Sequence, residues 1–532
     1  MPNFVDEVAR RRTFAIISHP DAGKTTLTEK LLLYGGAIQL AGEVKAKANR
    51  RQTRSDWMSI ERQRGISVVT SVMTFDYHGT IFNLLDTPGH EDFSEDTYRT
   101  LSAVDSAVMV IDAARGIEAR TRKLFEVCRL RDIPIVTFIN KLDRESRDPF
   151  DLLEEIEKTL ALDTTPLTWP LASGRAFAGV YDLTSDTIRR FEREQAVPLA
   201  AADGADNASE IAALLPPDMA ETVVEEIALA KAACRPFDKT SFLEGHLTPV
   251  LFGSALRNFG VSDLIETLAA FAPPPGPRNT EERLVKPDEA AMTGFVFKIQ
   301  ANMDPNHRDR IAFLRVCSGR LERGMKARLA RTGKPTAITA PQFFFAQERA
   351  TADEAFAGDI VGIPNHGTLR IGDTLTDGEQ LNFRGVPSFA PEILRRIRVE
   401  DAMKAKKLGE ALRQMAEEGV VQVFTPFDGS PPIVGVVGAL QLDVLKERMA
   451  AEYNLPIDFE AARFQVCRWV MAETPARLDQ FSIENRADMA SDLDGAPVFM
   501  ASSDFMLNHA KERAPEIEFT DIKDYQRQSV KQ

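Results

Sequence analysis

The first half of the chain contains a series of short apolar runs, and each of them ends in a polar or turn-forming segment. The runs are "FAIISH" from position 14, "TIFNLLD" from 80, "SAVMVID" from 106, "IPIVTFIN" from 133 and "TPVLFGSA" from 248. Runs of this length without polar alternation are typical of strands that are buried on both faces of a parallel sheet, with helical stretches such as "ARTRKLFEVCRLR" between them. The sequence therefore predicts that the chain begins with an α/β domain.

The segment "ISHPDAGKTTL", positions 17–27, joins the first run to a stretch with helical spacing and has the form of a phosphate-binding loop. Ser18 stands where the general G-x-x-x-x-G-K-[ST] pattern has its first glycine. Such a loop needs backbone N–H groups that converge on a phosphate, a lysine charge, and a hydroxyl that binds Mg²⁺. Gly23, Lys24 and Thr25 provide these groups at the N-terminus of the predicted helix, which also favours anions.

A second motif, "LLDTPGH", ends the run that begins at 80. Asp86 would lie at the end of a buried strand, where its carboxylate can reach the water shell of a metal ion. The N–H group of Gly89 could then meet the terminal phosphate. Because Asp-Thr-Pro-Gly is also good turn chemistry, this motif on its own leaves a purely structural role open.

Two further strand ends point to the base of the nucleotide. In "NKLD" (140–143), Asp143 can accept hydrogen bonds from the N1–H group and the exocyclic amine of guanine, a pair of donors that adenine lacks. A site built around such bonds rejects the analogue without them by about 10⁴–10⁵-fold. Ser254, Ala255 and Leu256 end another run, where a backbone N–H group could contact the guanine oxygen. Since ligands bind at the carboxyl ends of strands in such sheets, the motifs together predict a GTP site.

Beyond this domain the sequence pattern changes twice. The long stretch between Asp143 and Ser254 exceeds what one βα unit requires, so we expect a subdomain inserted at about 160–245. The proline-rich segment "FAPPPGPRNTEE" predicts a stiff linker. After it, short runs broken by Gly, Asp and Pro predict an antiparallel β-barrel, and the mixed strands and helices that follow predict an α+β domain. The predicted domains cover residues 1–278, 279–386 and 387–532.

The charged residues are unevenly distributed. The formal net charge of the 532-residue chain is −14, which disfavours nucleic acid as a partner of the surface as a whole. Residues 43–65, however, contain seven Lys or Arg and three acidic residues, and residues 298–349 contain eleven and four. A basic run on its own is as often a solvated face as a binding surface, so its meaning depends on the rest of the chain.

Cysteine usage and hydropathy indicate the compartment. The four cysteines lie far apart without a C-x-x-C pair, which predicts neither a disulfide framework nor a zinc site. The apolar run near the N-terminus is too short for a secretory signal, and no segment has the length that spans a membrane. We therefore expect a cytoplasmic protein.

Taken together, these motifs resemble those of the translational GTPases of the elongation-factor-G-like group. "SHPDAGKTT" is similar to their phosphate loop, in which a small residue often replaces the first glycine. "ERQRGISV" (61–68) resembles their first switch, which implies that the hydroxyl of Ser67 binds Mg²⁺ where the family usually has threonine. His90 matches the histidine that, in this family, orients the attacking water once ribosomal RNA has ordered the site.

The resemblance runs through nearly the whole chain. "SGRLERGMKARL" and "AGDIVGI" resemble the β-barrel domain of the family, "KLGEALRQMAEEG" and "VGALQLDVLKERM" resemble the third domain of elongation factor G, and "PLTWPLASGRAFAGVYDLTSD" resembles the insertion of one subgroup. No segment resembles the two further domains with which elongation factor G reaches the decoding site. This favours the release-factor branch of the group over translocation factors.

The resemblance implies a ribosome-associated GTPase that uses GTP and Mg²⁺, leaves GDP, and promotes the dissociation of class I release factors after peptide release. Its implied partners are the ribosome, to whose RNA the two basic runs would bind, and class I release factors, with no membrane and no second copy of the chain. His90 and Lys24 would be catalytic, and Thr25, Ser67 and Asp86 would hold the metal. The nucleotide-binding residues would be Ser18, His19, Pro20, Asp21, Ala22, Gly23, Lys24, Thr25, Thr26, Asp86, Thr87, Pro88, Gly89, His90, Asn140, Lys141, Leu142, Asp143, Ser254, Ala255 and Leu256.

Other functions stay open at this point. One is a different ribosomal GTPase, for translocation or for ribosome protection. Another is a nucleotide-gated binding switch with little turnover, which His90→Ala would separate from a GTPase. A third is an ATP-using enzyme with the same loop, in which Asp143 would be structural.

Overall fold

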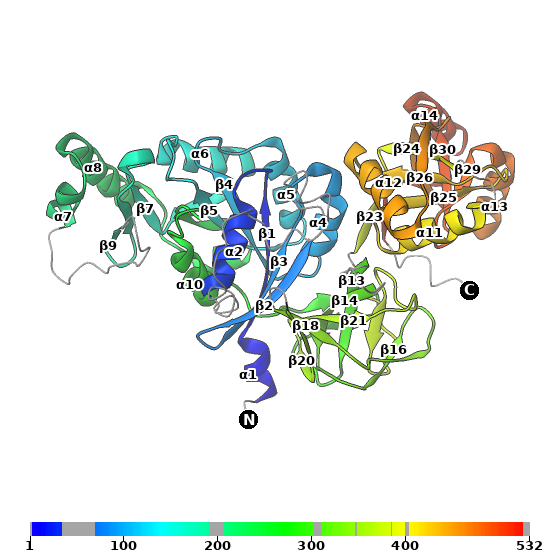
Figure 1. Cartoon of the computed structure of the whole chain (residues 1–532), viewed down its shortest axis with the longest axis horizontal. Helices are drawn as coiled ribbons and strands as arrows, with labels where there is room; N and C mark the ends of the chain where they lie inside the picture. Colours follow the sequence, from blue (N-terminus) through cyan, green and yellow to red (C-terminus); the bar gives the residue numbers. More distant parts are fainter. Residues whose placement is uncertain are drawn as a thin grey trace.

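The computed structural model describes residues 3–34, 70–190, 207–301, 310–345, 348–384, 386–399 and 404–524. Figure 1 shows an α/β body that holds the blue to green part of the chain, a β-rich body below it, and an orange to red α+β body at the right. The predicted fold class is confirmed, because a parallel sheet is followed by an antiparallel β domain and a mixed domain. The predicted metal ligand Ser67 and the basic run 43–65 lie outside the described residues.

The first body is built on one seven-stranded sheet with the order β2-β3-β1-β4-β5-β10-β6. Its strands are β1 (Arg11–Ser18), β2 (Ser71–Tyr77), β3 (Thr80–Asp86), β4 (Ser106–Asp112), β5 (Ile135–Asn140), β6 (Asp163–Pro166) and β10 (Leu247–Phe252). The strands are parallel except β2, which forms an antiparallel hairpin with β3. The apolar runs of the sequence are therefore the central strands, and their motifs lie at one edge of the sheet.

Helices cover both faces of this sheet. Phe14 of β1 packs in a core with Leu27 on one face, whereas the next residue, Ala15, packs in a core with Leu124 on the other. Full burial of a Leu or Phe side chain contributes about 1.5–3 kcal/mol, so both faces hold the sheet in place. The helices are α2 (Lys24–Tyr34) and α10 (Val261–Phe271) on one face, and α4 (Ser94–Leu101), α5 (Ala119–Arg129) and α6 (Pro149–Leu160) on the other. A short helix, α1 (Phe4–Ala9), precedes β1.

A small subdomain lies between β6 and β10, at the left end of Figure 1. It consists of a three-stranded sheet and helices: β7 (Thr168–Leu171), β8 (Gly179–Asp182), β9 (Thr187–Arg190), α7 (Asn207–Leu214), α8 (Pro217–Ala233) and α9 (Lys239–Leu243). Trp169 anchors it: the ring is wholly buried against Phe150 and Phe252, and its Nε1 donates to Glu226 at 3.1 Å. The same burial raises the pKa of Glu226, although the bond from Trp169 opposes this.

The second body is an antiparallel sheet of eight strands with the order β17-β16-β22-β13-β14-β21-β18-β19. Its strands are β13 (Thr293–Ala301), β14 (Arg310–Ser318), β16 (Lys326–Leu329), β17 (Pro335–Ala337), β18 (Gln342–Phe345), β19 (Glu348–Thr351), β21 (Ile360–Pro364) and β22 (Thr374–Thr376). The short pairs β15 (Arg320–Glu322) with β20 (Glu354–Phe356), and β11 (Arg278–Asn279) with β12 (Leu284–Val285), flank it.

The third body is a second eight-stranded sheet with helices. Its sheet strands are β24 (Ile393–Val399), β25 (Gln422–Pro426), β26 (Ile433–Val436), β27 (Ile457–Ala461), β28 (Val466–Ala472), β29 (Met489–Ser491), β30 (Pro497–Ala501) and β31 (Ile517–Thr520). Its helices are α11 (Ala405–Glu417), α12 (Ala439–Tyr453), α13 (Pro475–Glu484) and α14 (Asp504–Arg513). The pair β23 (Pro387–Phe389) and β32 (Ile522–Asp524) closes its near side, next to α4.

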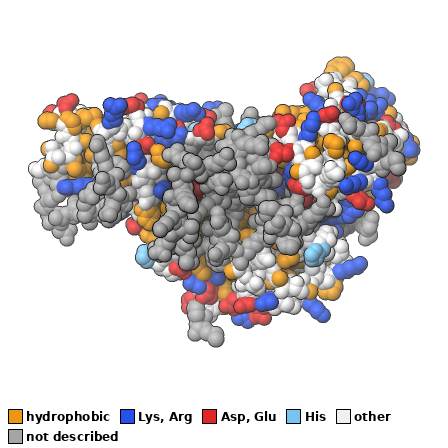
Figure 2. All heavy atoms as spheres, in the orientation of Figure 1, with side chains coloured by type: hydrophobic (Ala, Val, Ile, Leu, Met, Phe, Trp, Pro, Cys, Tyr) orange, Lys and Arg blue, Asp and Glu red, His pale blue; other side chains and the backbone are white. Residues whose placement is uncertain are grey.

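Three residues of the basic run 298–349 pair with acidic residues of another body. The binding of this run to ribosomal RNA stays a prediction. The Lys298 Nζ lies 3.0 Å from Asp96 and the Arg315 Nη2 lies 2.5 Å from Asp105, so both join the second body to the first. Arg310 pairs with Glu417 of the third body at 2.9 Å. Figure 2 shows one face of the protein, where Lys and Arg side chains are mixed with acidic ones over all three bodies.

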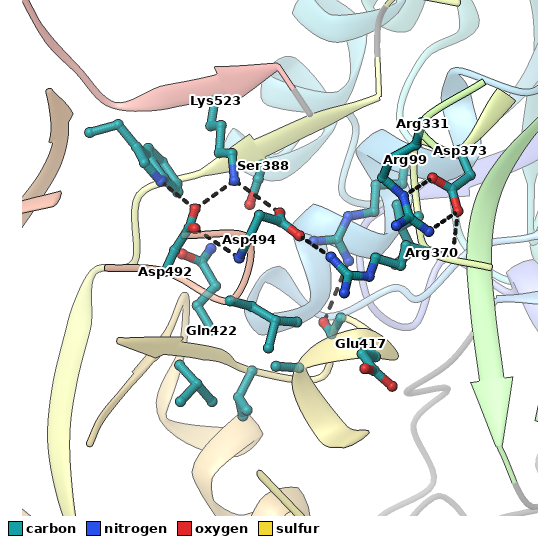
Figure 3. A pocket seen from close by; sticks show the side chains of 18 of the residues that line it. Arg99, Arg331, Arg370, Asp373, Ser388, Glu417, Gln422, Asp492, Asp494 and Lys523 are labelled. Carbon is teal, nitrogen blue, oxygen red and sulfur yellow. Dashed lines mark hydrogen bonds and ion pairs between the residues drawn. The ribbon is translucent and has the colours of Figure 1, made fainter. Parts of the chain in front are cut away.

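The three bodies meet around a cavity of about 530 Å³. Figure 3 shows that its charged side chains face one another: Arg331 binds Asp373, Arg370 binds Asp494, and Lys523 reaches across to Asp494. Desolvation alone would lower the pKa of Lys523, but its carboxylate partners raise it. Of these pairs, Arg370–Asp494 joins the second body to the third, whereas each of the other two lies within one body.

All four cysteines are free, and burial raises the pKa of the Cys128, Cys317 and Cys467 thiols to about 12. A thiol with so high a pKa is unreactive at neutral pH. Within the described ranges, we find no helix with the length and hydropathy needed to cross a membrane.

Candidate active site

A cavity of about 320 Å³ opens at the carboxyl edge of the first sheet. Residues from four of the predicted motifs, the phosphate loop and those at 84–90, 140–143 and 254–256, meet there, although the motifs are far apart in the sequence. The lining residues are Ser18, His19, Pro20, Asp21, Gly23, Lys24, Thr25, Thr26, Gly89, His90, Asn140, Lys141, Asp143, Arg144 and Leu256. Parallel strands bring their carboxyl ends to one edge, which is why the fold assembles this site.

The loop between β1 and α2 is tightly fitted to its neighbours. Gly23 has a φ of +94°, and a Cβ at this position would lie 2.4 Å from Asn140 Nδ2. Asp21 also has a positive φ, of 65°. Helix α2 begins at Lys24, so the backbone N–H groups of its first turn are open to an anion. Ser18, in place of the usual glycine, is the last residue of β1, and its hydroxyl donates to the His19 carbonyl at 2.9 Å.

Lys24 and Asp86 form the charged centre of the site. The Lys24 Nζ lies 2.5 Å from Asp86 Oδ1, and both side chains are buried. Among the described residues, the second oxygen of Asp86, Oδ2, is buried without a hydrogen-bond partner. A buried carboxylate oxygen without a partner, close to the hydroxyl-bearing first turn of α2, fits the water shell of a Mg²⁺ ion, which prefers oxygen ligands and keeps several waters.

The "NKLD" segment holds the neighbouring loops together. Asn140 Nδ2 donates to the Ala22 carbonyl at 2.8 Å, and Asn140 Oδ1 accepts from the Ala255 N–H group at 2.9 Å. Lys141 Nζ donates to the Asp21 carbonyl and to Asp112 Oδ2, the latter at 2.8 Å. One segment therefore fixes both the phosphate loop and the loop after β10.

Asp143 lies at the base end of the cavity. Its carboxylate accepts a hydrogen bond from the Ser254 hydroxyl, which orients it. Leu256, also at the cavity wall, is 55% exposed. An apolar side chain beside an oriented carboxylate provides one surface for the face of a purine and one acceptor for its edge.

His90 lies at the opposite end, after the Asp-Thr-Pro-Gly turn. The Thr87 hydroxyl fixes this turn by donating to the Ile16 carbonyl of β1 at 2.7 Å. The imidazole of His90 is about a third exposed, and its Nδ1 accepts from the Asp92 N–H group at 3.3 Å. His90 and Gly89 therefore border the cavity where the terminal phosphate would lie.

Some of the predicted residues support the cavity without lining it. These are Ala22, Asp86, Thr87, Pro88, Leu142, Ser254 and Ala255. Several of them are buried behind the lining residues. Thr87, Ser254 and Ala255 support the lining through hydrogen bonds. His19 lines the cavity with a wholly buried side chain, and its Nδ1 contacts the Pro20 carbonyl at 2.6 Å.

Sequence reasoning missed two acidic residues at the site. Asp112, the last residue of β4, holds Lys141; burial would raise the pKa of Asp112, but the bonds from Lys141 and the Ala114 N–H group lower it. Its place at the end of an apolar run was a signal of the same kind as that of Asp86. Asp92 contacts both His90 and the third body, a role for which the sequence holds no signal.

Comparisons with known proteins agree with this geometry. Residues 9–274 match the family model described as the elongation factor Tu GTP binding domain. Residues 291–378 match elongation factor G domain 2, and residues 383–511 match the class II release factor RF3, C-terminal domain.

A similar arrangement is found in a solved crystal structure of a protein from Thermus thermophilus. The two chains are 23% identical with a TM-score of 0.67, and the similarity covers 87% of this chain and 71% of that one. At this identity the likeness supports the fold, whereas the matched domains identify the family. The chain therefore belongs to the elongation-factor-G-like translational GTPases, enzymes that hydrolyse GTP, and its matched domains together are those of class II release factor RF3.

Proposed function

We propose that the protein binds the ribosome with GTP after peptide release and promotes the departure of class I release factors, and that GTP hydrolysis then frees the protein itself. The observation that carries this proposal is the match of residues 383–511 to the C-terminal domain of class II release factors. That domain packs directly on the segment after His90, so a change at the nucleotide can reach it. We also propose that the protein acts in the cytoplasm as a monomer, without a membrane.

We assign the nucleotide contacts by position. Lys24 and the first-turn N–H groups of α2 would bind the β- and γ-phosphates, and Asp143 would accept from the guanine edge. Thr25 and Asp86, the latter through water, would hold Mg²⁺ together with Ser67 of the undescribed segment. The ion, when bound, neutralises charge on the transferred phosphoryl group.

The chemical step needs positioning more than covalent participation, because phosphoryl transfer depends mainly on alignment and charge stabilisation. We propose that His90 orients the attacking water. Its Nδ1 is occupied by the Asp92 N–H group, which leaves Nε2 as the ring nitrogen for the water. A partly exposed imidazole suits a site that becomes active only on the ribosome.

We keep the predicted domain boundaries, at 278 and 386, as part of the proposal. Helix α10 ends at Phe271, and the Arg278–Asn279 strand already pairs with β12 beside the barrel. At the other boundary, an isolated β-bridge pairs Thr280 with Phe383 on the barrel side. Strand β23 then begins the third body at Pro387.

The test measures how fast a labelled class I release factor leaves post-termination ribosomes, with and without this protein and GTP. We expect a large acceleration that requires both. His90→Ala should still accelerate the first departure but should stay on the ribosome, because it binds GTP without hydrolysing it. No acceleration by a protein that still shows ribosome-stimulated hydrolysis would contradict the proposal and favour translocation or ribosome protection.

A further inference from the structure

Helix α12 of the third body begins without a capping side chain of its own. Its N-cap residue is Gly438, and the first-turn N–H groups of any helix need acceptors. Gln441 Oε1 accepts from the Val437 and Gly438 N–H groups at 2.7 and 3.2 Å. The Leu440 N–H group instead donates to Asp92 Oδ2 at 2.6 Å, so its acceptor comes from the GTPase domain. A carboxylate at a helix N-terminus is also favoured by the helix dipole.

The same carboxylate faces His90. Asp92 Oδ1 lies 3.4 Å from His90 Nδ1, and the Asp92 N–H group lies 3.3 Å from that nitrogen. The Asp92 side chain is 14% exposed, so it is enclosed between the imidazole and the helix end. One carboxylate therefore contacts both the residue at the phosphate end of the nucleotide site and the first turn of α12.

Gly438 shows how close this contact is. Its φ of −140° is an extended conformation that any residue adopts, so the backbone does not require glycine there. A Cβ on Gly438, however, would lie 2.0 Å from Asp92 Cγ and 2.2 Å from Asp92 Oδ1. A side chain at position 438 would therefore displace the Asp92 carboxylate.

The contact continues along α4. The Ser388 hydroxyl donates to Glu95 at 3.0 Å, and the rings of Tyr98 and Phe389 lie 5.1 Å apart. The third body thus holds the segment after His90 over its whole length. A displacement of the third body would move this segment and, with it, the support of the imidazole.

We propose that Asp92 is a positioning residue that ties the orientation of His90 to the seating of the C-terminal domain. When α12 is seated on Asp92, the backbone N–H group of Asp92 holds His90 Nδ1 in one position; when α12 moves, that hold is lost. This inference rests on the proposed role of His90, and the experiment below separates the two.

The test compares two glycine substitutions in the third body. Gly438→Ala pushes the Asp92 side chain away from α12, and it leaves the amino-acid sequence of the GTPase domain unchanged. Gly409→Ala, in the exposed face of α11, is the matched control, since no described residue lies within 4 Å of the added methyl group. Single-turnover GTP hydrolysis is measured at saturating ribosomes, together with KM for GTP and the affinity for labelled GDP.

We expect Gly438→Ala to lower the ribosome-stimulated rate about 10- to 100-fold, the effect of a misplacement of about 1 Å. KM and GDP affinity should stay unchanged, because the phosphate loop is not touched, and Gly409→Ala should behave as the unaltered protein. Asp92→Ala should reproduce the loss, whereas Asp92→Asn, which keeps an acceptor for the Leu440 N–H group, should restore most of the rate. Hydrogen exchange at the Leu440 amide should quicken in Asp92→Ala.

The controls make each result decisive. If His90→Ala abolishes hydrolysis while Gly438→Ala and Asp92→Ala hydrolyse GTP at the normal rate, Asp92 is only a helix cap and the link is refuted. If His90→Ala itself hydrolyses normally, the proposed role of His90 is refuted, and the link with it. Unchanged exchange at Leu440 in Asp92→Ala would show that the cap does not form.

Discussion

At the scale of single residues, the site depends on side chains that hold loops as much as on those that face the nucleotide. Asn140 joins Ala22 to Ala255 and leaves no room for a side chain at Gly23. Asp143 is held by Ser254 in a fixed orientation. A carboxylate with a fixed orientation is what discrimination between purines requires, since its two acceptors must meet two donors at once.

Asp143→Asn should move the preference from GTP towards xanthosine triphosphate. The amide has a donor where the carboxylate accepts, so it complements the oxygen that xanthine carries in place of the exocyclic amine. Binding of labelled GDP and of its xanthosine analogue measures the change. Asp148→Asn is the matched control, because Asp148 caps α6 from an exposed position where asparagine caps equally well. Equal GDP binding by the two variants would contradict the guanine assignment.

At the scale of elements, helix α4 is the common contact of the three bodies. Asp96 on α4 accepts from the Thr70 N–H group at 3.0 Å and from Lys298 of β13 at 3.0 Å. Arg99 on the same helix donates to the Gly419 carbonyl of the third body at 3.5 Å. Burial alone would raise the pKa of Asp96, but the Lys298 charge and the Thr70 hydrogen bonds lower it below its ordinary value of 3.8.

Lys298→Met should therefore destabilise the junction by about 3 kcal/mol, because it leaves a carboxylate without its buried partner. Urea denaturation measures the loss, and the double variant Lys298→Met/Asp96→Asn should recover part of it. Since the pKa of Asp96 is lower in the folded protein, its contribution is full above pH 3.8 and is lost as the pH falls through the lowered pKa. A Lys298→Met protein as stable as the original would show that the pair contributes nothing.

The elements were predictable from the sequence where the signal is local. The bounds of β3 and β4 are those of the apolar runs in the sequence, because their burial follows from their own residues. β6, which joins the main sheet from within the insertion, was not predicted. The contacts of Asp92 and Lys298 were not predicted either, because their partners are hundreds of positions away and are brought close only by the packing of whole bodies.

At the scale of the whole molecule, some basic residues that cluster in the sequence form ion pairs between the bodies. Arg310, Arg315 and Lys298 belong to a basic run in the sequence, yet each binds an acidic residue of another body. Their charges hold the three bodies around the cavity of Figure 3. Helix α4, which follows the segment of His90, therefore contacts both the second and the third body.

The most direct test of this account is GTP hydrolysis by the purified protein, measured with and without post-termination ribosomes. Because His90 is partly exposed and hydrolysis is proposed to require the ribosome, we expect slow GTP turnover by the protein without ribosomes. With ribosomes, we expect an acceleration of at least about 10³-fold, the lower end of what an external stabilising group provides. Equal rates with and without ribosomes, in a protein that binds GTP normally, would contradict it.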